Sequence, residues 1–373
     1  MSHTPFHHVH MHFAFTLLHQ FMPAQSEHTS VLSPASILLT LGMVGNGATA
    51  TTREAITTVM GLDTLSLEQF NQASAAWQRS LDALQAQGTL MLANALWLRD
   101  TVPVQPDFAA CLQQYYQAET HTLDFQDPAA ASRINTWISD RTCGRIPHMI
   151  DTVRDNLVLI LTNALAFKGK WTFPFDPAET TTGTFYLPDG SHQHPPMMSQ
   201  TRSDIPYYRS EQFQMIALPY GDDQRITMYL LLPAEHITLA DCCMQLDASS
   251  WQNLLAQLTP APGTVVLPRL SLTSKHDLKE VLTALGMGIA FDPELAHFQG
   301  ISEVHSWIGS ILHHTALEVN EAGTEAAAAT AILQRSFNPT PPFSMVFDRP
   351  FLCIIADTQT DIPLFMGIIT EPA

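Results

Sequence analysis

The amino-acid sequence predicts an α+β protein. In the first third of the chain, apolar residues recur at three-and-four spacing between helix-capping residues. In the middle and at the end, apolar or alternating runs are bounded by glycine, proline and aspartate, which is typical of strands. Several of these runs are apolar on both faces, as in the central strands of a covered sheet. Helices followed by strands in large sheets indicate the α+β class.

The predicted helices follow from periodicity and end signals. The segment "FAFTLLHQF" (13–21) has helical spacing, and "SPASILLTLGMVGNG" (33–47) begins with a serine cap and a first-turn proline and ends in glycine. The segment "TREAITTVMG" (52–61) has the same form, and "AAASRINTWISDRTCGRI" (129–146) is a further helix.

The predicted strands are apolar or alternating runs. They are "TLMLANALWL" (89–98), "NLVLILTNALAF" (156–167), "MIALPY" (215–220), "ITMYLLLP" (226–233) and "GTVVLPRLSL" (263–272). The carboxyl-terminal sequence from 343 to 369 predicts a pair of apolar strands. We find no internal repeat and no linker, so residues 1–373 are expected to form a single domain.

Composition restricts the function. The chain has 373 residues and is 46% hydrophobic, yet no stretch reaches the roughly 20 apolar residues of a membrane span, which predicts a soluble protein. The first residues lack a basic segment, a long apolar run and a cleavage site, so a cytoplasmic location is expected unless a leader has been removed. A net charge of −18 argues against nucleic acid or an anionic membrane as partner.

The histidine and cysteine residues are candidate metal ligands. The five cysteines are odd in number and lack C-x-x-C spacing, which favours reduced, buried thiols over a disulfide framework or a zinc site. Near the amino terminus lie His3, His7, His8, His10 and His12. They could bind a transition metal, but a frayed, solvated terminus is the favoured interpretation. In "DGSHQHPPMMSQ" (189–200), two histidines could share a strand face, although a surface hairpin explains the segment equally well.

Motifs for catalysis are missing from the sequence. It contains no G-x-S-x-G, no H-E-x-x-H, no G-x-x-x-x-G-K-S/T and no G-x-G-x-x-G after a strand. Scattered triads escape such a search, so an enzyme starts without support rather than excluded. We therefore expect no enzyme, no metal and no cofactor.

The most unusual stretch is "EAGTEAAAATAILQRSFNPTPP" (321–342). Alanine is the best helix former, and Thr324 could cap a helix over the alanine run. Prolines at 339, 341 and 342 prevent any helix from continuing. The stretch lies directly before the carboxyl-terminal strands.

This stretch, with several others, resembles the serpin family. The segment "VNEAGTEAAAAT" (319–330) is similar to the hinge of an inhibitory serpin reactive-centre loop. Other family-like segments occur in order and at the expected intervals: "SPASILLTLGMVGNGATATTREAI", "LTNALAFKGKWTFPFDP", "LPRLSLTSKHDLKEVLTALGM", "FDRPFLCII" and "PLFMGII". The resemblance covers essentially the whole chain.

The resemblance implies a fold of three β-sheets with eight or nine helices and an exposed reactive-centre loop at about 321–342. It also implies a monomeric suicide inhibitor of serine proteases: the protease cleaves the loop, forms an acyl-enzyme, and is trapped when the loop inserts into the main sheet. A papain-like cysteine protease, which also forms an acyl-enzyme, is an alternative partner. The alternative function is a non-inhibitory serpin that acts as a binding or chaperone-like protein.

The hinge composition favours inhibition. The hinge residues are Glu321, Gly323, Thr324, Glu325, Ala326, Ala327, Ala328 and Ala329. In an inserted strand, alternate side chains face opposite ways, so Glu325 and Arg335 would share one face and the other face would carry no charge. Small side chains and the lack of proline before Pro339 suit insertion. The sequence departs from the common hinge at Ala322, where Glu, Lys or Arg is usual.

The resemblance also implies a switch region. Ser36, Asn163 and His313 match polar residues under the main sheet, where a hydrogen-bonded cluster can hold two arrangements. Glu321 and Arg269 fall where family members pair an acid with a base. Trp171 is expected to pack beside that pair.

The cleaved bond is predicted with alternatives. Family spacing from Gly323 places the residue before the bond at Phe337, followed by Asn338, which suits a chymotrypsin-like protease. Arg335-Ser336 suits a trypsin-like protease, and cleavage after Leu333 is a weaker third option. Phe337 is preferred because a loop shorter by two residues loses about 7 Å of reach along the sheet.

Overall fold

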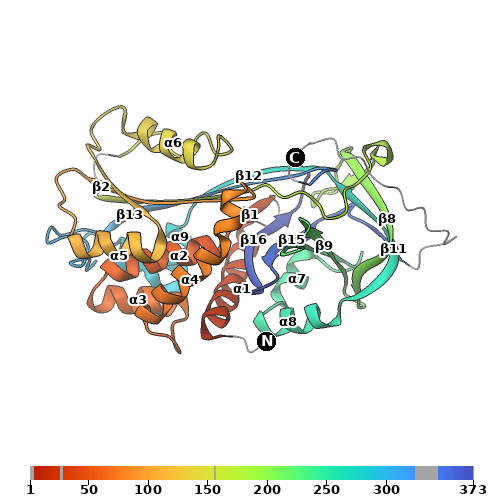
Figure 1. The fold of residues 1–373 in the computed structure, drawn as a ribbon, viewed down its shortest axis with the longest axis horizontal. Helices are drawn as coiled ribbons and strands as arrows, with labels where there is room; N and C mark the ends of the chain where they lie inside the picture. Colours follow the sequence, from red (N-terminus) through yellow and green to blue (C-terminus); the bar gives the residue numbers. More distant parts are fainter. Residues whose placement is uncertain (1–3, 26–27, 155–156, 324–342, 373) are drawn as a thin grey trace. The chain divides into compact units, whose positions relative to one another are not determined.

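The computed structural model describes residues 4–25, 28–154, 157–323 and 343–372. Among these residues it contains the helices α1 (Pro5–Gln25), α2 (Pro34–Gly47), α3 (Ala50–Met60), α4 (Leu67–Ala86), α5 (Pro106–Tyr116), α6 (Ala130–Arg141), α7 (Leu239–Met244), α8 (Ala248–Gln257) and α9 (Lys279–Leu282). Figure 1 labels these helices.

The described residues also form three β-sheets. The five-stranded sheet contains, in spatial order, β12 (Leu270–Asp277), β13 (Ile308–Val319), β4 (Leu159–Phe167), β2 (Leu90–Arg99) and β3 (Glu119–Leu123). The nine-stranded sheet has the order β1 (Ser30–Leu32), β16 (Ile362–Ile369), β15 (Phe351–Asp357), β10 (Ile226–Pro233), β9 (Phe213–Tyr220), β8 (Pro196–Arg209), β11 (Thr259–Pro268) and β14 (Phe343–Val346), with β5 (Thr181–Thr182) on β8. The third sheet is the hairpin of β6 (Phe185–Tyr186) and β7 (His192–Gln193).

Contacts divide the chain into two compact units. Unit 1 comprises residues 1–13, 34–166 and 274–316, and unit 2 comprises residues 14–33, 167–273 and 317–373. Each unit is therefore assembled from three separate segments. The expectation of a single domain stays a prediction.

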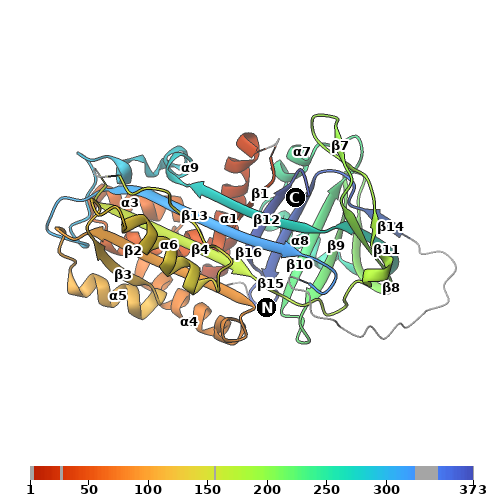
Figure 2. The same ribbon diagram turned by 90° about the horizontal axis from the view of Figure 1, so that it is seen from above.

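Unit 1 holds most of the five-stranded sheet. Helix α6 covers one face of this sheet, and helices α2 to α5 lie on the other side (Figure 1). Figure 2 shows β12, β13 and β4 side by side. Under α6, the core includes Trp97, Ile134 and Ile160, each at most 2% exposed. Burial on both sides explains why β4 is apolar apart from Thr162 and Asn163.

Unit 2 holds the nine-stranded sheet, whose strands β10, β15 and β16 are buried along their whole length. Helix α8 places Trp251 in the core, where its ring meets the edge of Tyr229 at 5.4 Å between centroids. The Nε2 of His19 hydrogen-bonds to the carbonyl oxygen of Leu246 at 2.8 Å. Strands β15 and β16 thus lie inside a covered sheet.

Most predicted elements were found with shifted ends. The helix expected at 129–146 ends at Arg141, because Cys143 and Gly144 adopt positive φ angles of 51° and 76°. The helix expected at 52–61 begins at Ala50 and is ended by Gly61, whose φ is 72°.

Two of the predictions gave too few strands. The single strand expected at 263–272 is two strands in different sheets, because β11 ends at Pro268, which cannot donate a ladder hydrogen bond, and β12 begins at Leu270. The carboxyl-terminal pair is three strands, β14, β15 and β16. Proline again marks a boundary, since Pro350 lies directly before β15.

The amino terminus was also predicted wrongly. Instead of a frayed, solvated segment, the histidine-rich sequence forms the first half of α1 from Pro5 onward. His7 and His10 are only 5% and 2% exposed. Burial, with a smaller effect of His7, lowers the pKa of His10 to about 3, so this imidazole is neutral in the folded protein.

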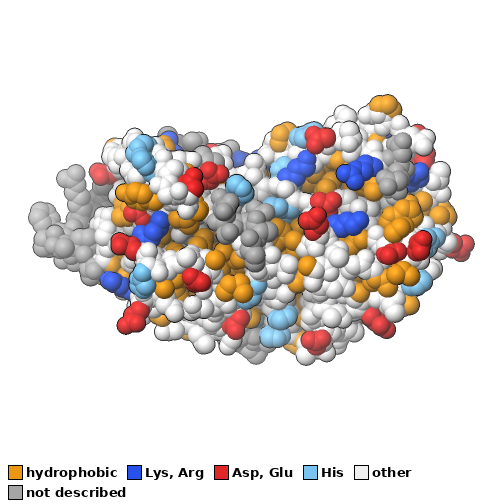
Figure 3. Space-filling view, turned by 180° about the vertical axis from the view of Figure 1, so that it is seen from behind, with side chains coloured by type: hydrophobic (Ala, Val, Ile, Leu, Met, Phe, Trp, Pro, Cys, Tyr) orange, Lys and Arg blue, Asp and Glu red, His pale blue; other side chains and the backbone are white. Residues whose placement is uncertain are grey.

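The described surface mixes charged and apolar groups. No helix among the described residues is long and apolar enough to cross a membrane. On the face drawn in Figure 3, lysine and arginine side chains lie singly or in small groups among acidic ones. Hydrophobic side chains on this face are likewise scattered in small groups. On this face, acidic side chains are therefore dispersed rather than gathered in one patch.

Candidate functional site

The first polar cluster lies in unit 1 and is centred on Asn163 of β4, which is fully buried. Its amide oxygen accepts a hydrogen bond from Nδ1 of His313, on the neighbouring strand β13, at 2.5 Å. Its Nδ2 faces four acceptors: the carbonyl and hydroxyl oxygens of Ser36, the Thr40 Oγ1 at 3.0 Å and the Asn94 Oδ1 at 2.6 Å. An amide has two N–H groups, so the acceptors outnumber the protons and more than one hydrogen-bond arrangement is available.

No ionised group is needed in this cluster. Burial, reinforced by His276 and His314, lowers the pKa of His313 well below its ordinary value. The imidazole is therefore neutral, and its Nδ1 carries the proton because the Asn163 oxygen can only accept. Thr40 adds a hydrogen bond from its hydroxyl to the Ser36 carbonyl at 3.1 Å.

The next residue of β13, His314, points to the opposite face of the sheet, because side chains alternate along a strand. Burial, together with Lys275 and His276, lowers the pKa of His314 to about 4. A hydrogen bond to the backbone of His148 acts in the other direction but does not outweigh the burial. Two adjacent histidines on β13 are thus held neutral on both faces of the sheet.

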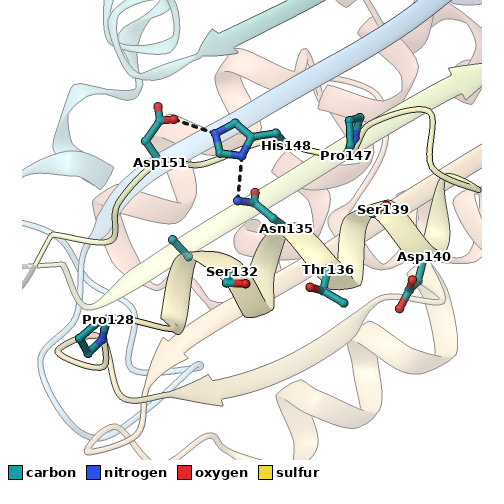
Figure 4. Close-up of a pocket in the computed structure, with 10 residues that line it drawn as sticks. Pro128, Ser132, Asn135, Thr136, Ser139, Asp140, Pro147, His148 and Asp151 are labelled. Carbon is teal, nitrogen blue, oxygen red and sulfur yellow. Dashed lines mark hydrogen bonds and ion pairs between the residues drawn. The ribbon is translucent and has the colours of Figure 1, made fainter.

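The segment that follows α6 lies over this second face and forms a surface groove with the helix. The groove has a volume of about 500 Å³, and Figure 4 shows Asn135 of α6 pointing across it toward His148. The Asn135 amide accepts from the backbone nitrogen of Met149 at 2.8 Å and donates to the Ile150 carbonyl at 2.8 Å. His148 in turn lies 2.7 Å from the Asp151 carboxylate. These bonds fasten the segment 148–151 to α6.

The second polar cluster lies in unit 2 and is built around Glu321, which is 7% exposed. Arg269, in the gap between β11 and β12, contacts this carboxylate through Nη2 at 2.6 Å and through Nε at 2.9 Å. Thr180 donates a further hydrogen bond at 2.6 Å. Burial alone would raise the pKa of Glu321, but the hydrogen bonds from Arg269 and Thr180 outweigh it and hold the pKa below its ordinary value.

Trp171 contacts the residues on either side of Glu321. Its ring nitrogen donates to the Asn320 carbonyl at 2.9 Å, and its backbone nitrogen donates to the Ala322 carbonyl at 3.0 Å. The indole stacks on Tyr220 with ring centroids 4.1 Å apart. The five switch residues expected from the sequence therefore fall into two clusters, with Trp171 and Arg269 in the second.

Residues 320–323 form a tight turn directly after β13. Asn320 and Gly323 exchange both backbone hydrogen bonds, at 2.6 and 3.1 Å, with Glu321 and Ala322 at the tip. On its other side, Gly323 forms an antiparallel bridge to Lys170, three residues beyond the end of β4. The strands β13 and β4 are neighbours in the sheet, and Gly323 lies between the segments that continue them.

Only glycine fits at position 323. Its φ is 127°, and a Cβ there would lie 2.1 Å from the Gly169 carbonyl oxygen. The remaining hinge residues, Thr324 and Glu325 to Ala329, lie outside the described residues. So do both predicted cleavage sites, Phe337-Asn338 and Arg335-Ser336.

Several residues of these clusters were missed from the sequence. Thr40 and Asn94 carry a usable signal, since each is an isolated polar residue in a predicted apolar element. Thr180 and Asn135 carry no such signal, because they lie in polar segments. In the described residues, no group of three or more histidine, cysteine, aspartate or glutamate side chains is placed to hold a metal ion.

Comparison with known proteins identifies the family. The family model Serpin (serine protease inhibitor) matches residues 8–372. Glia-derived nexin from Rattus norvegicus is 32% identical over 95% of this chain and 91% of its own. A solved structure of native protease nexin-1 with heparin has a TM-score of 0.88 at 26% identity, and it covers 98% of this chain and 99% of the other. The chain belongs to the serpin family.

The fold predicted from the resemblance is confirmed, with three sheets and nine α-helices among the described residues. The same fold occurs in thyroxine-binding globulin complexed with thyroxine, at a TM-score of 0.88 and 23% identity, covering 98% of this chain and 99% of the other. That likeness shows the fold alone. The two solved structures with this fold thus contain different ligands, heparin in one and thyroxine in the other.

Proposed function

We propose that this serpin is a suicide inhibitor of serine proteases, acting as a monomer without a cofactor. The target protease attacks a bond in the loop at about 321–342, and its active-site serine forms an acyl-enzyme with the residue before the bond. The amino-terminal part of the cut loop then becomes a new strand between β13 and β4. The covalently attached protease travels with it and is trapped.

The observation that carries the proposal is the turn at residues 320–323. This turn reverses the chain after β13, so that Gly323 runs antiparallel to Asn320 at the end of that strand. Gly323 is already bridged to Asn320 on one side and to Lys170 on the other, as the first residue of an inserted strand would be. Insertion would continue this bridge from Gly323 into residue 324 and beyond as β4 and β13 separate.

The composition of the loop supports the same function. Residues 326–329 are alanines, which enter between two strands with little displacement of side chains. Each inserted residue adds ladder hydrogen bonds, and proline, which would remove one, first occurs at 339. Glu325 and Arg335 fall on the same face of such a strand, and the opposite face carries no charge to be buried.

The cluster around Asn163 is compatible with the entry of a new strand between β4 and β13. It joins β4 to β13 through the bond between Asn163 and His313, and this bond must break when a strand enters between them. The Nδ2 of Asn163 keeps its acceptors on α2 and β2 after His313 is lost, whereas its Oδ1 needs a new donor. We infer that the cluster holds Asn163 in place on the side of β4 while the sheet opens.

The target is a chymotrypsin-like protease that cleaves after Phe337. Cleavage after Arg335 by a trypsin-like protease is the competing assignment, and it shortens the inserted strand by about 7 Å. A papain-like cysteine protease could also be trapped, since it forms an acyl-enzyme.

The test is incubation with chymotrypsin and, separately, with trypsin, followed by denaturing gel electrophoresis and mass spectrometry of the released carboxyl-terminal peptide. The expected result is a band at the summed mass that survives denaturation, with a peptide that starts at Asn338. A peptide that starts at Ser336 would assign the bond to Arg335 instead. Cleavage without such a band, with every serine protease tried, would leave the non-inhibitory binding or chaperone-like protein as the function.

Matched variants separate cleavage from trapping. Ala328→Pro leaves the predicted bonds intact but removes a ladder donor from the inserted strand, so we expect cleavage to continue and the resistant band to fall at least tenfold. Thr330→Ala keeps that donor and should trap like the natural sequence. Phe337→Ala should slow trapping of chymotrypsin, while Arg335→Gln should leave it unchanged.

A further inference from the structure

The histidine-rich start of α1 is not used by the inhibitory function. The helix divides its histidines between two faces: His7 and His10 are buried, whereas His8 and His12 are exposed. His10 packs against Phe6, with ring centroids 4.5 Å apart, and against Trp77 at 5.3 Å. The buried face thus anchors this part of the helix to the core of unit 1.

The spacing of the two exposed histidines allows both to bind the same metal ion. Residues four apart on an α-helix lie one above the other on the same face. The rings of His8 and His12 stack with centroids 6.4 Å apart and planes inclined by 19°. The same i, i+4 spacing brings two imidazoles onto one metal ion in helical zinc sites.

The imidazole rings of His8 and His12 are also available to bind a metal ion. Among the described residues, neither ring takes part in a hydrogen bond or an ion pair. A second exposed pair, His192 and His194, has ring centroids 5.1 Å apart, but Nδ1 of His194 lies 3.2 Å from the Gly183 carbonyl oxygen. His148 is likewise occupied by Asp151. A metal therefore competes with no existing partner at His8 and His12.

We propose that His8 and His12 together bind one divalent transition-metal ion of the Zn²⁺, Ni²⁺ or Cu²⁺ class on the surface of α1. Each imidazole supplies one nitrogen at about 2.0–2.1 Å, and water fills the remaining positions. Small side-chain rotations bring the two nitrogens together, because both rings are exposed and face solvent. Neutral imidazole favours these metals, whereas Mg²⁺ and Ca²⁺ prefer oxygen ligands.

The two rings have different surroundings. A Cβ at Gly61, the residue that ends α3, would lie 3.2 Å from Cδ2 of His12, so this ring rests close to the glycine. His8 lies nearer the helix start, where the partial positive charge of the amino terminus weakly opposes a cation. That cost is small beside two coordinate bonds.

Binding should clamp the start of the helix. The two ligands lie about 6 Å apart along the axis, so one ion bridges a full turn. Since α1 carries Phe6, His7 and His10 into the core, fixing this turn stabilises the folded protein against fraying from its amino-terminal end. The proposal does not depend on protease inhibition.

The test is isothermal titration of the full chain with NiCl₂ and with ZnCl₂, using MgCl₂ as the reference salt. We expect one ion to bind per chain, and either His8→Asn or His12→Asn to weaken binding at least tenfold. Both side chains are exposed, so neither variant should unfold the protein. The matched control replaces His192 and His194 by asparagine and should leave the titration unchanged.

Hydrogen exchange of the amides of residues 8–16 provides a second measurement. With NiCl₂ these amides should exchange more slowly in the natural sequence, and no change is expected in His12→Asn. Binding that survives both single substitutions, or that is lost only in the His192 and His194 control, overturns the proposal. Equal binding of Mg²⁺ would overturn it as well, because imidazole does not select that ion.

Discussion

The two polar clusters use different chemistry to hold a strand junction. Around Asn163, neutral side chains with at most 6% exposure share hydrogen bonds, and the acceptors outnumber the amide protons. Around Glu321, one carboxylate is fixed by an arginine whose side chain is 46% exposed, and a backbone bridge completes the junction. The first cluster is a network, and the second is an ion pair beside a turn.

This difference predicts how much a substitution in each cluster lowers the free energy of unfolding. A neutral buried network loses most when its central residue is removed, because every partner then loses a hydrogen bond in a buried position. An ion pair with one exposed partner loses less, because water already weakens the pair at the exposed guanidinium and Thr180 still bonds to the carboxylate. The first cluster should also tolerate the loss of a single peripheral acceptor, because others remain.

The largest expected effect comes from Asn163→Ala. It leaves His313, Asn94 and the Ser36 carbonyl buried without their common partner, which should lower the free energy of unfolding by about 3–5 kcal/mol. Urea denaturation monitored by tryptophan fluorescence measures the change. The control Thr40→Val removes one peripheral hydroxyl and should cost about 1 kcal/mol. Equal losses in the two variants would show that Asn163 is not the centre of the network.

Arg269→Gln should have a smaller effect. It removes the charge facing a carboxylate that is 7% exposed, and we expect a loss of about 1–3 kcal/mol. Glu321→Gln and the double variant complete a cycle whose coupling energy isolates the pair. A coupling indistinguishable from zero would mean that the two side chains act independently of each other.

Trp171→Phe separates hydrogen bonding from packing. Phenylalanine keeps an aromatic ring against Tyr220 but loses the bond from the indole nitrogen to the Asn320 carbonyl, so we expect a loss of about 1 kcal/mol. Hydrogen exchange of the Gly323 amide should speed up in this variant, because the turn that it closes is less well held. Unchanged exchange would show that the backbone bridge alone fixes the turn.

The smallest effect concerns pH and His314. Its folded pKa, about 4, lies below the ordinary value of 6.5, so the unfolded chain takes up a proton first as the pH falls. The stability that neutral His314 contributes is therefore fully present above about pH 6.5 and is lost progressively toward pH 4. His314→Gln removes this titration, and the variant should lose about 0.5–1 kcal/mol less than the natural sequence between pH 7 and pH 5. Parallel urea curves at the two pH values provide the measurement.

Part of the first cluster was predictable from sequence alone. The tripeptide Asn-Ala-Leu occurs at 94–96 and at 163–165, in both cases inside a predicted apolar strand. A lone amide in such a run must find a buried partner, so both asparagines signal a shared network. Thr40 on α2 carries a similar signal, but the sequence does not reveal which turn of that helix faces β4.

The structure of the histidine-rich terminus, by contrast, was predicted wrongly from the sequence. Its composition predicted a solvated segment, yet the structure buries His7 and His10 in the core of unit 1. The helical period places these two residues on the same side as Phe6, but composition alone gave no reason to extend the helix that far. The aromatic surface of Phe70 and Trp77, which comes from α4, is what makes their burial favourable.

The fold class and the family followed from the sequence alone, because periodicity, turn residues and a series of ordered segments are local properties of the chain, while the position of the loop stays a prediction. The sequence also indicated an acid and a base near the loop. Only the tertiary structure decided that Glu321 is buried beside Arg269, that Gly323 is bridged on both sides, and that Asn163 serves four acceptors. These pairings join residues from about 50 to more than 100 positions apart, and the packing of helices on sheets selects such partners among many polar residues.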